Sequence, residues 1–183
     1  MNLQDYISRL SGKYGIPSQI TQALALIESG MRNDIVNYEP LYQWLWDCDE
    51  MKPFRNLTDD ETLSNFAPMG FTAPIAFPTN PDAEYIQQKM TWGPFQQYGA
   101  CIREAGYQGP FITLANCPET ATHFMLIQLS KLRDKYFDKH GWAGVMAAYD
   151  AGRPRKTEDG QYVNRDFLIA LVKNGAKGLI NYT

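Results

Sequence analysis

One glutamate of this chain stands where its side chain could transfer a proton. Ile20, Leu24 and Glu28 are four residues apart in a stretch typical of a helix, so they share one ridge of that helix. Ala23 and Ile27 flank the ridge with further apolar groups. Burial of a carboxyl group among such neighbours disfavours its anion and raises its pKa, and the carbonyls of a last helical turn act in the same direction. A carboxylic acid that keeps its proton near neutral pH can protonate a leaving oxygen, as glycosidic cleavage requires.

The spacing alone leaves a second interpretation of Glu28 open, because a single glutamate at a helix end usually faces solvent. The helix that would carry Glu28 has clear limits in the sequence. Pro17 stands where a helix can begin, since the first turn does not need its missing N–H. The apolar stretch then runs to Ser29, and Gly30 favours a stop.

Helical patterns dominate the rest of the chain, and strand signals are weak. Pro118 begins the longest pattern, over 118–138, in which apolar residues follow a 3.6-residue period. The fold class expected is therefore mainly α. Besides the helix that ends at Ser29, the sequence predicts helices over 2–10, 96–105, 118–138, 141–149 and 162–173.

The region of about 40–90 differs from the rest because six prolines interrupt it and no long amphipathic period survives. It is expected to hold at most short helices, over 41–47 and 58–65. We interpret it as a long irregular insertion lying over the surface. The length of 183 residues suits one domain, so residues 1–183 are predicted to form a single domain with this insertion.

Composition excludes several classes of function. The net charge of −3 and the scattered lysines and arginines give no basic stripe for nucleic acid. No stretch approaches the about 20 apolar residues of a membrane span, and the N-terminus has no signal-peptide pattern, so synthesis in the cytoplasm is expected. The three cysteines are odd in number and form no CxxC pair, and only two histidines exist. A metal enzyme is therefore not expected.

Several short motifs resemble those of the soluble-type lytic transglycosylases, particularly the members found in bacteriophages. The family's first signature is a helix that ends in Glu-Ser, and its later signatures are Gly-Leu-Met-Gln and Ala-Tyr-Asn-Ala-Gly. The matches occur in the family's order over roughly residues 14–172, with the 40–90 region between them. They read ALALIESG at 23–30, YEP at 38–40, TWGPFQ at 91–96, AYDAG at 148–152 and QYVNR at 161–165.

The resemblance implies a lysozyme-like helical fold that acts on the glycan strands of peptidoglycan. Glu28 would meet the β-1,4 bond between N-acetylmuramic acid and N-acetylglucosamine. Most glycosidases need two carboxylates, but the acetamido group of the substrate can replace the second. The implied products are 1,6-anhydromuramic ends, formed without consumption of water.

The resemblance also implies roles for the residues of the matched motifs. Tyr149 would orient Glu28, Gln96 would hold a sugar substituent with its donor and acceptor atoms, and Ser29 would fix the end of the helix. Gly93 would leave room for the glycan, and Phe95 would form an apolar wall. Core packing stays open for Tyr149 and Phe95, and a surface position stays open for Gln96. The predicted substrate-binding residues are Ser29, Gly93, Phe95, Gln96, Tyr149, Asp150 and Tyr162.

The chain departs from the family pattern at several positions. Pro94 and Phe95 replace Leu and Met, and Asp150 replaces Asn. If Asp150, Asp34 or Glu39 reached the opposite face of the sugar, it could activate water, and the enzyme would be a lysozyme-like muramidase. A third possibility is a virion component that binds glycan without cutting it.

The expected partner is peptidoglycan, with no nucleic acid and no membrane span. We expect a monomer that acts on the cell wall, in the host periplasm, and that could be carried there in a virion. A lysis enzyme, an enzyme of the virion and an accessory enzyme of a secretion system remain alternatives at this level.

Overall fold

The computed structural model describes residues 2–75 and 80–182 and is 55% helical, so the prediction of a mainly α fold is confirmed. The chain divides into two compact units. Residues 2–31 and 125–182 form one, here called the helical unit, and 32–75 with 80–124 form the other, the mixed unit. The expected single domain remains a prediction. No helix of the two described ranges combines the length and the apolar character that crossing a bilayer would need.

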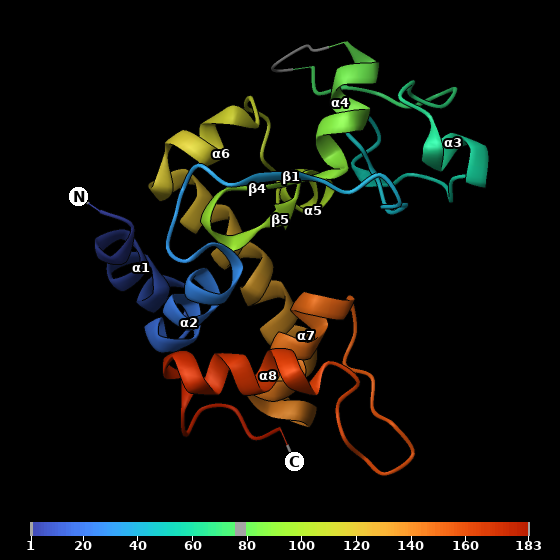
Figure 1. Cartoon of the computed structure of the whole chain (residues 1–183). Helices are drawn as coiled ribbons and strands as arrows, with labels where there is room; N and C mark the ends of the chain where they lie inside the picture. The colour runs from blue at the N-terminus through green and yellow to red at the C-terminus, as the bar shows by residue number, and fades with distance from the viewer. Residues whose placement is uncertain (1, 76–79, 183) are drawn as a thin grey trace. The chain divides into compact units, whose positions relative to one another are not determined.

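The helical unit contains α1, α2, most of α7, and α8 with the turn of π-helix that follows it (Figure 1). α2 packs against α1 and α8, and also against the π-helical turn η3. The chain leaves this unit after Met31 and returns to it within α7. Its elements are α1 (Leu3–Ser11), η1 (Gly12–Tyr14), α2 (Ser18–Ser29), α7 (Pro118–Ala151), α8 (Arg165–Leu171) and η3 (Val172–Ala176).

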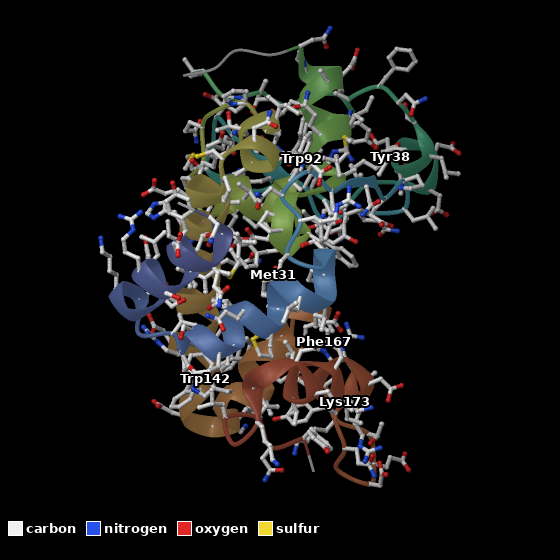
Figure 2. The ribbon with its side chains drawn as sticks, turned by 60° about the vertical axis from the view of Figure 1, so that its left-hand side comes forward. Met31, Tyr38, Trp92, Trp142, Phe167 and Lys173 are labelled. Carbon is white, nitrogen blue, oxygen red and sulfur yellow. The ribbon has the colours of Figure 1, made fainter. Side chains whose placement is uncertain are left out.

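α2 has the limits that the sequence predicts. Its first turn follows Pro17, whose carbonyl accepts a hydrogen bond from the backbone of Ile20 at 3.0 Å. Gly30 ends the helix in the left-handed conformation (φ 63°), which a glycine adopts without steric cost. Met31, which follows Gly30 directly (Figure 2), also has a positive φ of 66°.

α7 is two helical segments rather than one continuous helix. Gly141 lies between them with a non-helical backbone (φ 58°, ψ −165°). The helices predicted over 118–138 and 141–149 are therefore both present, and the first is slightly longer than expected. The helix predicted over 162–173 is shorter, because α8 begins only at Arg165 and gives way to the wider η3 turn at Val172.

The mixed unit contains the strands of the molecule's described part and four short helices. β1 (Val36–Tyr38), β4 (Met90–Trp92) and β5 (Gln97–Tyr98) form an antiparallel sheet in the order β1-β4-β5, with Val36 opposite Trp92. β2 (Trp46–Asp47) pairs with β3 (Lys52–Pro53). The helical elements are α3 (Asp59–Leu63), α4 (Pro81–Gln88), η2 (Gly93–Phe95), α5 (Gly99–Glu104) and α6 (Ile112–Asn116), followed by the start of α7.

Two helices predicted for this unit differ from the structure, and one helix of the structure was not predicted. The segment 41–47 is not helical and ends in β2. α4 is absent from the predicted helices, because Pro81 reads as an interruption, whereas it stands at the start of a helix that Asn80 caps. The helix predicted over 96–105 begins only at Gly99, because the backbone of Gln96 is left-handed (φ 46°) and the next two residues form β5.

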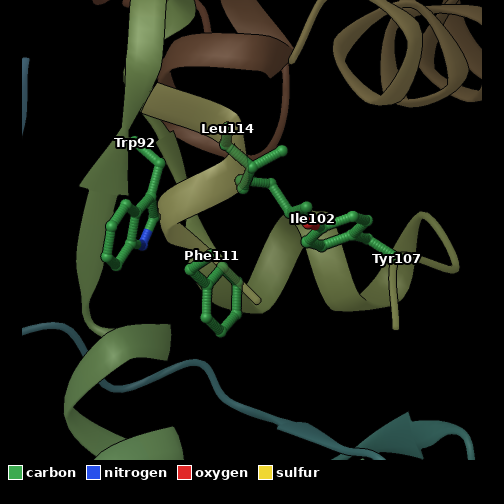
Figure 3. Close-up of a cluster of buried hydrophobic side chains, with 5 residues drawn as sticks. All are labelled: Trp92, Ile102, Tyr107, Phe111 and Leu114. Atoms are coloured by element: carbon green, nitrogen blue, oxygen red, sulfur yellow. The ribbon is translucent and has the colours of Figure 1, made fainter. Parts of the chain in front are cut away.

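The core of the mixed unit beside the sheet is an aromatic cluster (Figure 3). Side chains from β4, α5 and α6 and from the loop between the two helices converge there. The rings of Trp92 and Phe111 stack with their centroids 5.4 Å apart. The guanidinium carbon of Arg103 lies 4.0 Å from the centroid of Phe111, which links the cluster to a buried ion pair between Arg103 and Glu84. The cluster consists of Trp92, Ile102, Tyr107, Phe111 and Leu114.

Candidate active site

Glu28 lies in the last turn of α2, at the end of the ridge that the sequence predicts. Ile20 and Leu24 are fully buried on that ridge, and the flanking Ala23 is buried too. Glu28 itself is half-buried, so it is neither enclosed in the core nor fully exposed to solvent. This half-burial favours a partly desolvated carboxyl group over a fully solvated one at Glu28.

Burial raises the pKa of Glu28 from 4.5 to about 7, and the negative charge of Asp150 adds to the effect. Both causes disfavour the anion, burial because it removes water and Asp150 because it places a like charge nearby. The expected contribution of the helix terminus is not among these causes. The amide of Gly30 donates to the carbonyl of Leu26 at 3.0 Å, and that of Met31 donates to Ala25 at 3.1 Å. A pKa near 7 suits a group that must both donate and accept a proton.

Ser29 helps to fix the end of α2. Its hydroxyl donates to the carbonyl of Ala25 at 3.1 Å, the same carbonyl that Met31 caps. This hydrogen bond supports the predicted role in positioning Glu28. Direct contact of Ser29 with substrate stays a prediction.

Asp150 is exposed near the end of α7, and Asn164 holds it. The amide nitrogen of Asn164 donates to the Asp150 carboxylate at 3.0 Å and to the carbonyl of Ala147 at 3.1 Å. Asn164 directly precedes α8, so one side chain joins the last turns of α7 to the start of α8. Sequence reasoning missed this role. The only signal was the family-like segment 161–165, which contains Asn164.

The two predicted tyrosines of the helical unit differ in setting. Tyr149 is half-buried in the last turns of α7, and its contact with Glu28 stays a prediction. Tyr162 is only 4% exposed, and its hydroxyl donates to the carbonyl of His140 at 3.4 Å. The ammonium of Lys156 lies 4.7 Å from the centre of the Tyr162 ring. These contacts give Tyr162 an anchoring role for the loop before α8.

Gln96 is the centre of a hydrogen-bond network in the mixed unit. Its amide oxygen accepts from Asn37 at 2.5 Å and from the Thr91 hydroxyl at 2.8 Å. Its amide nitrogen donates to the carbonyls of Gly93 at 2.8 Å and Ile35 at 3.2 Å. These bonds use both hydrogens and both lone pairs of the amide. Gln96 therefore ties β1 to β4 and η2, and a sugar could bind this amide only in exchange for one of these bonds.

Gly93 and Phe95 lie within η2, and packing explains both. A Cβ atom at Gly93 would lie 2.6 Å from the carbonyl oxygen of Leu114, and the backbone there is left-handed (φ 67°). Glycine is thus required for the approach of η2 to α6. Phe95 is 1% exposed, which favours the core-packing interpretation. Contact of either residue with a glycan stays a prediction.

The predicted site residues divide between the two units. Glu28, Ser29, Tyr149, Asp150 and Tyr162 belong to the helical unit, and Gly93, Phe95 and Gln96 belong to the mixed unit. Their assembly around one sugar remains a prediction. In the described ranges, no three His, Cys, Asp or Glu side chains gather in a group that could hold a metal ion.

Comparisons of the chain with protein families, with curated proteins and with solved structures gave no match. The family resemblance therefore depends on the motifs of the sequence.

Proposed function

We propose that this chain is a lytic transglycosylase that cleaves the β-1,4 bond between N-acetylmuramic acid and N-acetylglucosamine in peptidoglycan. The proposal includes a single lysozyme-like helical domain over residues 1–183, with the region of about 40–90 as an insertion. The observation that carries it is the half-buried Glu28, whose pKa is raised to about 7. The ordered motifs around Glu28, Gln96 and Tyr149 supply the substrate class.

Glu28 performs both proton transfers of the proposed reaction. The protonated carboxyl donates its proton to the bridging oxygen as the bond to the sugar carbon C1 breaks. The acetamido oxygen of the same sugar stabilises the cationic C1, in place of a second carboxylate. The Glu28 carboxylate then takes the proton of the C6 hydroxyl, and the oxygen of that hydroxyl bonds to C1. The ring closes to a 1,6-anhydro sugar, Glu28 regains its proton, and no cofactor is needed.

Mass spectrometry of digested peptidoglycan tests the reaction. A transglycosylase yields anhydromuramic ends, each lighter by one water than a hydrolysed end. Glu28→Gln should abolish these products while its glycan binding persists, because the amide keeps the shape and loses the proton. Retention of full cleavage by Glu28→Gln would refute the proposal.

A muramidase that uses water is the second candidate, and one observation favours it. Asp150 lies close enough to Glu28 to raise its pKa, so a second carboxylate is present near the proposed acid. Asp34 is a weaker candidate for this role, because it is exposed and forms an ion pair with Arg32 at 3.0 Å. Asp150→Asn separates the two reactions. A transglycosylase keeps its anhydro products in this variant. A hydrolase that relies on Asp150 yields only reducing ends as the wild-type protein and loses cleavage as the Asp150→Asn variant.

A glycan-binding role without cleavage is tested by the clearing of turbid suspensions of cells stripped of their outer membrane. Wild-type protein should clear the suspension, and Glu28→Gln should not. Binding of wild-type protein to glycan without any clearing would favour a virion component. We place the site of action in the bacterial cell wall, as the phage-like motifs suggest.

A further inference from the structure

A small pocket in the mixed unit lies among aromatic side chains. Its volume is about 180 Å³, and its walls come from β2 and the segment before it, from β3 and from α5. This volume is less than the roughly 300–1,000 Å³ of sites that enclose drug-sized ligands, so the pocket fits one small chemical group of a ligand. The lining residues are Tyr42, Trp44, Leu45, Trp46, Pro53, Ala100, Cys101 and Glu104.

Packing holds the aromatic walls in place. Tyr42 stacks on Tyr98 with ring centroids 3.8 Å apart, and its hydroxyl lies 3.6 Å from the sulfur of Cys101. Trp44 meets the ring of Tyr42 edge-on, with centroids 5.6 Å apart, yet it is 70% exposed. The backbone of Trp46 is hydrogen-bonded in both directions to the side chain of Gln88, at 2.8 and 3.0 Å. An exposed indole is thus presented at the edge of a pre-formed pocket.

Glu104 brings an acidic side chain to the wall of the pocket. Among the residues that the structure describes, Glu104 is the only charged one in the lining, which contains neither a lysine nor an arginine. The pKa of Tyr42 is raised, chiefly by burial and to a smaller extent by neighbours that include Glu104, so the carboxylate acts on the pocket wall. Aromatic faces carry negative charge density and attract cations, and a carboxylate adds to that attraction.

We propose that this pocket binds an alkylammonium group, with the cation against the indole of Trp44 and the carboxylate of Glu104. Cages of aromatic side chains suit such cations because the negative faces of the rings attract the cation in place of the water it loses. The same lining disfavours a nucleic-acid strand, since Glu104 repels phosphate. The binding is separate from the cleavage proposed for Glu28, and neither proposal depends on the other.

Choline and its neutral isostere 3,3-dimethylbutan-1-ol test this proposal as a matched pair. The chain has four tryptophans, so four indole N–H signals report binding in NMR titrations. Choline should shift the signals of Trp44 and Trp46, while Trp92 and Trp142, outside the pocket lining, serve as internal references. Because the aromatic rings and the carboxylate attract a cation but not its neutral isostere, choline should bind about tenfold more tightly than the alcohol. Equal affinity of the two compounds would overturn the proposal.

Two variants test whether choline binds in this pocket. Trp44→Ala should weaken choline binding about tenfold, whereas the control Phe66→Ala, in the same unit and 72% exposed, should leave it unchanged. Glu104→Gln should reduce the preference for choline over the alcohol. Unchanged choline binding by Trp44→Ala would also refute the proposal.

One further cation, ethanolamine, defines the class of ammonium group, and N-acetylglucosamine tests for a sugar site. Ethanolamine carries a primary ammonium, so tighter binding of ethanolamine than of choline assigns the pocket to amines such as those of peptides. Tighter binding of choline assigns it to quaternary head groups, and either result supports an alkylammonium site. If N-acetylglucosamine shifts the Trp44 signal and neither ammonium compound does, the pocket is a sugar site and the proposal fails.

Discussion

The surroundings of the Glu28 carboxyl group disfavour its ionised form. Burial and Asp150 together raise its pKa to about 7 in the folded chain, whereas the ordinary value is 4.5. Between these values the folded state binds more protons than the unfolded state, so stability falls as pH rises through this window. Above pH 7 the full cost of charging Glu28 is present, and it amounts to at most about 3 kcal/mol.

Glu28→Gln should therefore stabilise the protein at pH 8. The neutral amide removes the cost of the buried anion, so its free energy of unfolding should exceed that of wild type by up to about 3 kcal/mol. At pH 4 both side chains are neutral, and the difference should vanish. Urea denaturation at the two pH values measures it. Glu158→Gln, at an exposed position, is the control and should show no such dependence. Equal stability of Glu28→Gln and wild type at pH 8 would contradict the assigned environment.

Asp150→Asn should shift the pH dependence of cleavage. Removal of the negative charge lowers the pKa of Glu28, while burial, the larger cause, still keeps it above 4.5. The fall in rate at alkaline pH, where Glu28 loses its proton, should begin at a lower pH than in wild type. The new amide can still accept the hydrogen bond of Asn164. Rates across pH 5–9 measure the shift, and Asp159→Asn, in the exposed loop, is the control. An unmoved profile would show that Asp150 does not influence the reacting group.

At the level of residues, local spacing predicted part of the site. The burial of Glu28 follows from Ile20 and Leu24, which lie on the same helical ridge. The coupling of Glu28 to Asp150 does not follow, because the two residues are far apart in the sequence. The network of Gln96 was equally hidden, since its partner Asn37 lies 59 residues away. Sequence patterns report local geometry well and leave long-range partners undefined.

At the level of elements, the sequence predicted best those helices whose limits are marked by proline or glycine. α2 has both Pro17 and Gly30 as limits, and its predicted bounds are confirmed. The segment 41–47 has apolar spacing that resembles a helix, but the rings of Tyr42 and Trp44 meet edge-on in an irregular loop that ends in the short strand β2. Tertiary packing there overrides local propensity. The helix that begins at Pro81 was missed for another reason. Proline as a residue type both interrupts helices and occupies their first turn, so its presence alone does not tell the two cases apart.

Gly93→Ala tests the approach of η2 to α6. The added Cβ would lie 2.6 Å from the carbonyl oxygen of Leu114 and would also strain a left-handed backbone. Gly70 has a positive φ of 85° with open space around its Cβ position, so Gly70→Ala isolates the backbone strain at about 1–2 kcal/mol. Gly93→Ala should lose about 1–3 kcal/mol more, because overpacking is added. Urea denaturation compares the two variants, and equal losses would show that η2 and α6 are not in close contact.

At the level of the whole molecule, a buried ionic network is central to the mixed unit. Arg103 donates to both carboxylate oxygens of Glu84, at 2.8 and 3.0 Å, and to the carbonyls of Tyr107 and Gly109. Gln88 donates to Glu84 at 3.0 Å. The pair thus joins α4, α5 and the loop after α5, and both of its side chains are at most 1% exposed. Loss of one partner would leave the other charge buried and unpaired.

Arg103→Met should therefore lower the stability of the mixed unit by about 3–5 kcal/mol. Amide hydrogen exchange, read by mass spectrometry, should show loss of protection within 32–124 before the helices α1 and α2 are affected. Arg55→Met removes the exposed ion pair with Glu61 in the same unit and should change protection little. If the two variants exchange alike, the buried pair does not stabilise the unit as argued.

The packing around Glu84 has a consequence for thiol chemistry. Cys48 is buried there, and burial, with the charge of Glu84, raises its pKa to about 12. Almost no thiolate is present at neutral pH, and alkylating reagents attack only the thiolate. Cys48 should stay unmodified for as long as α4 and β2 remain packed around it. The rate at which Cys48 is alkylated then reports how often the mixed unit opens, and no cysteine has to be introduced for this measurement.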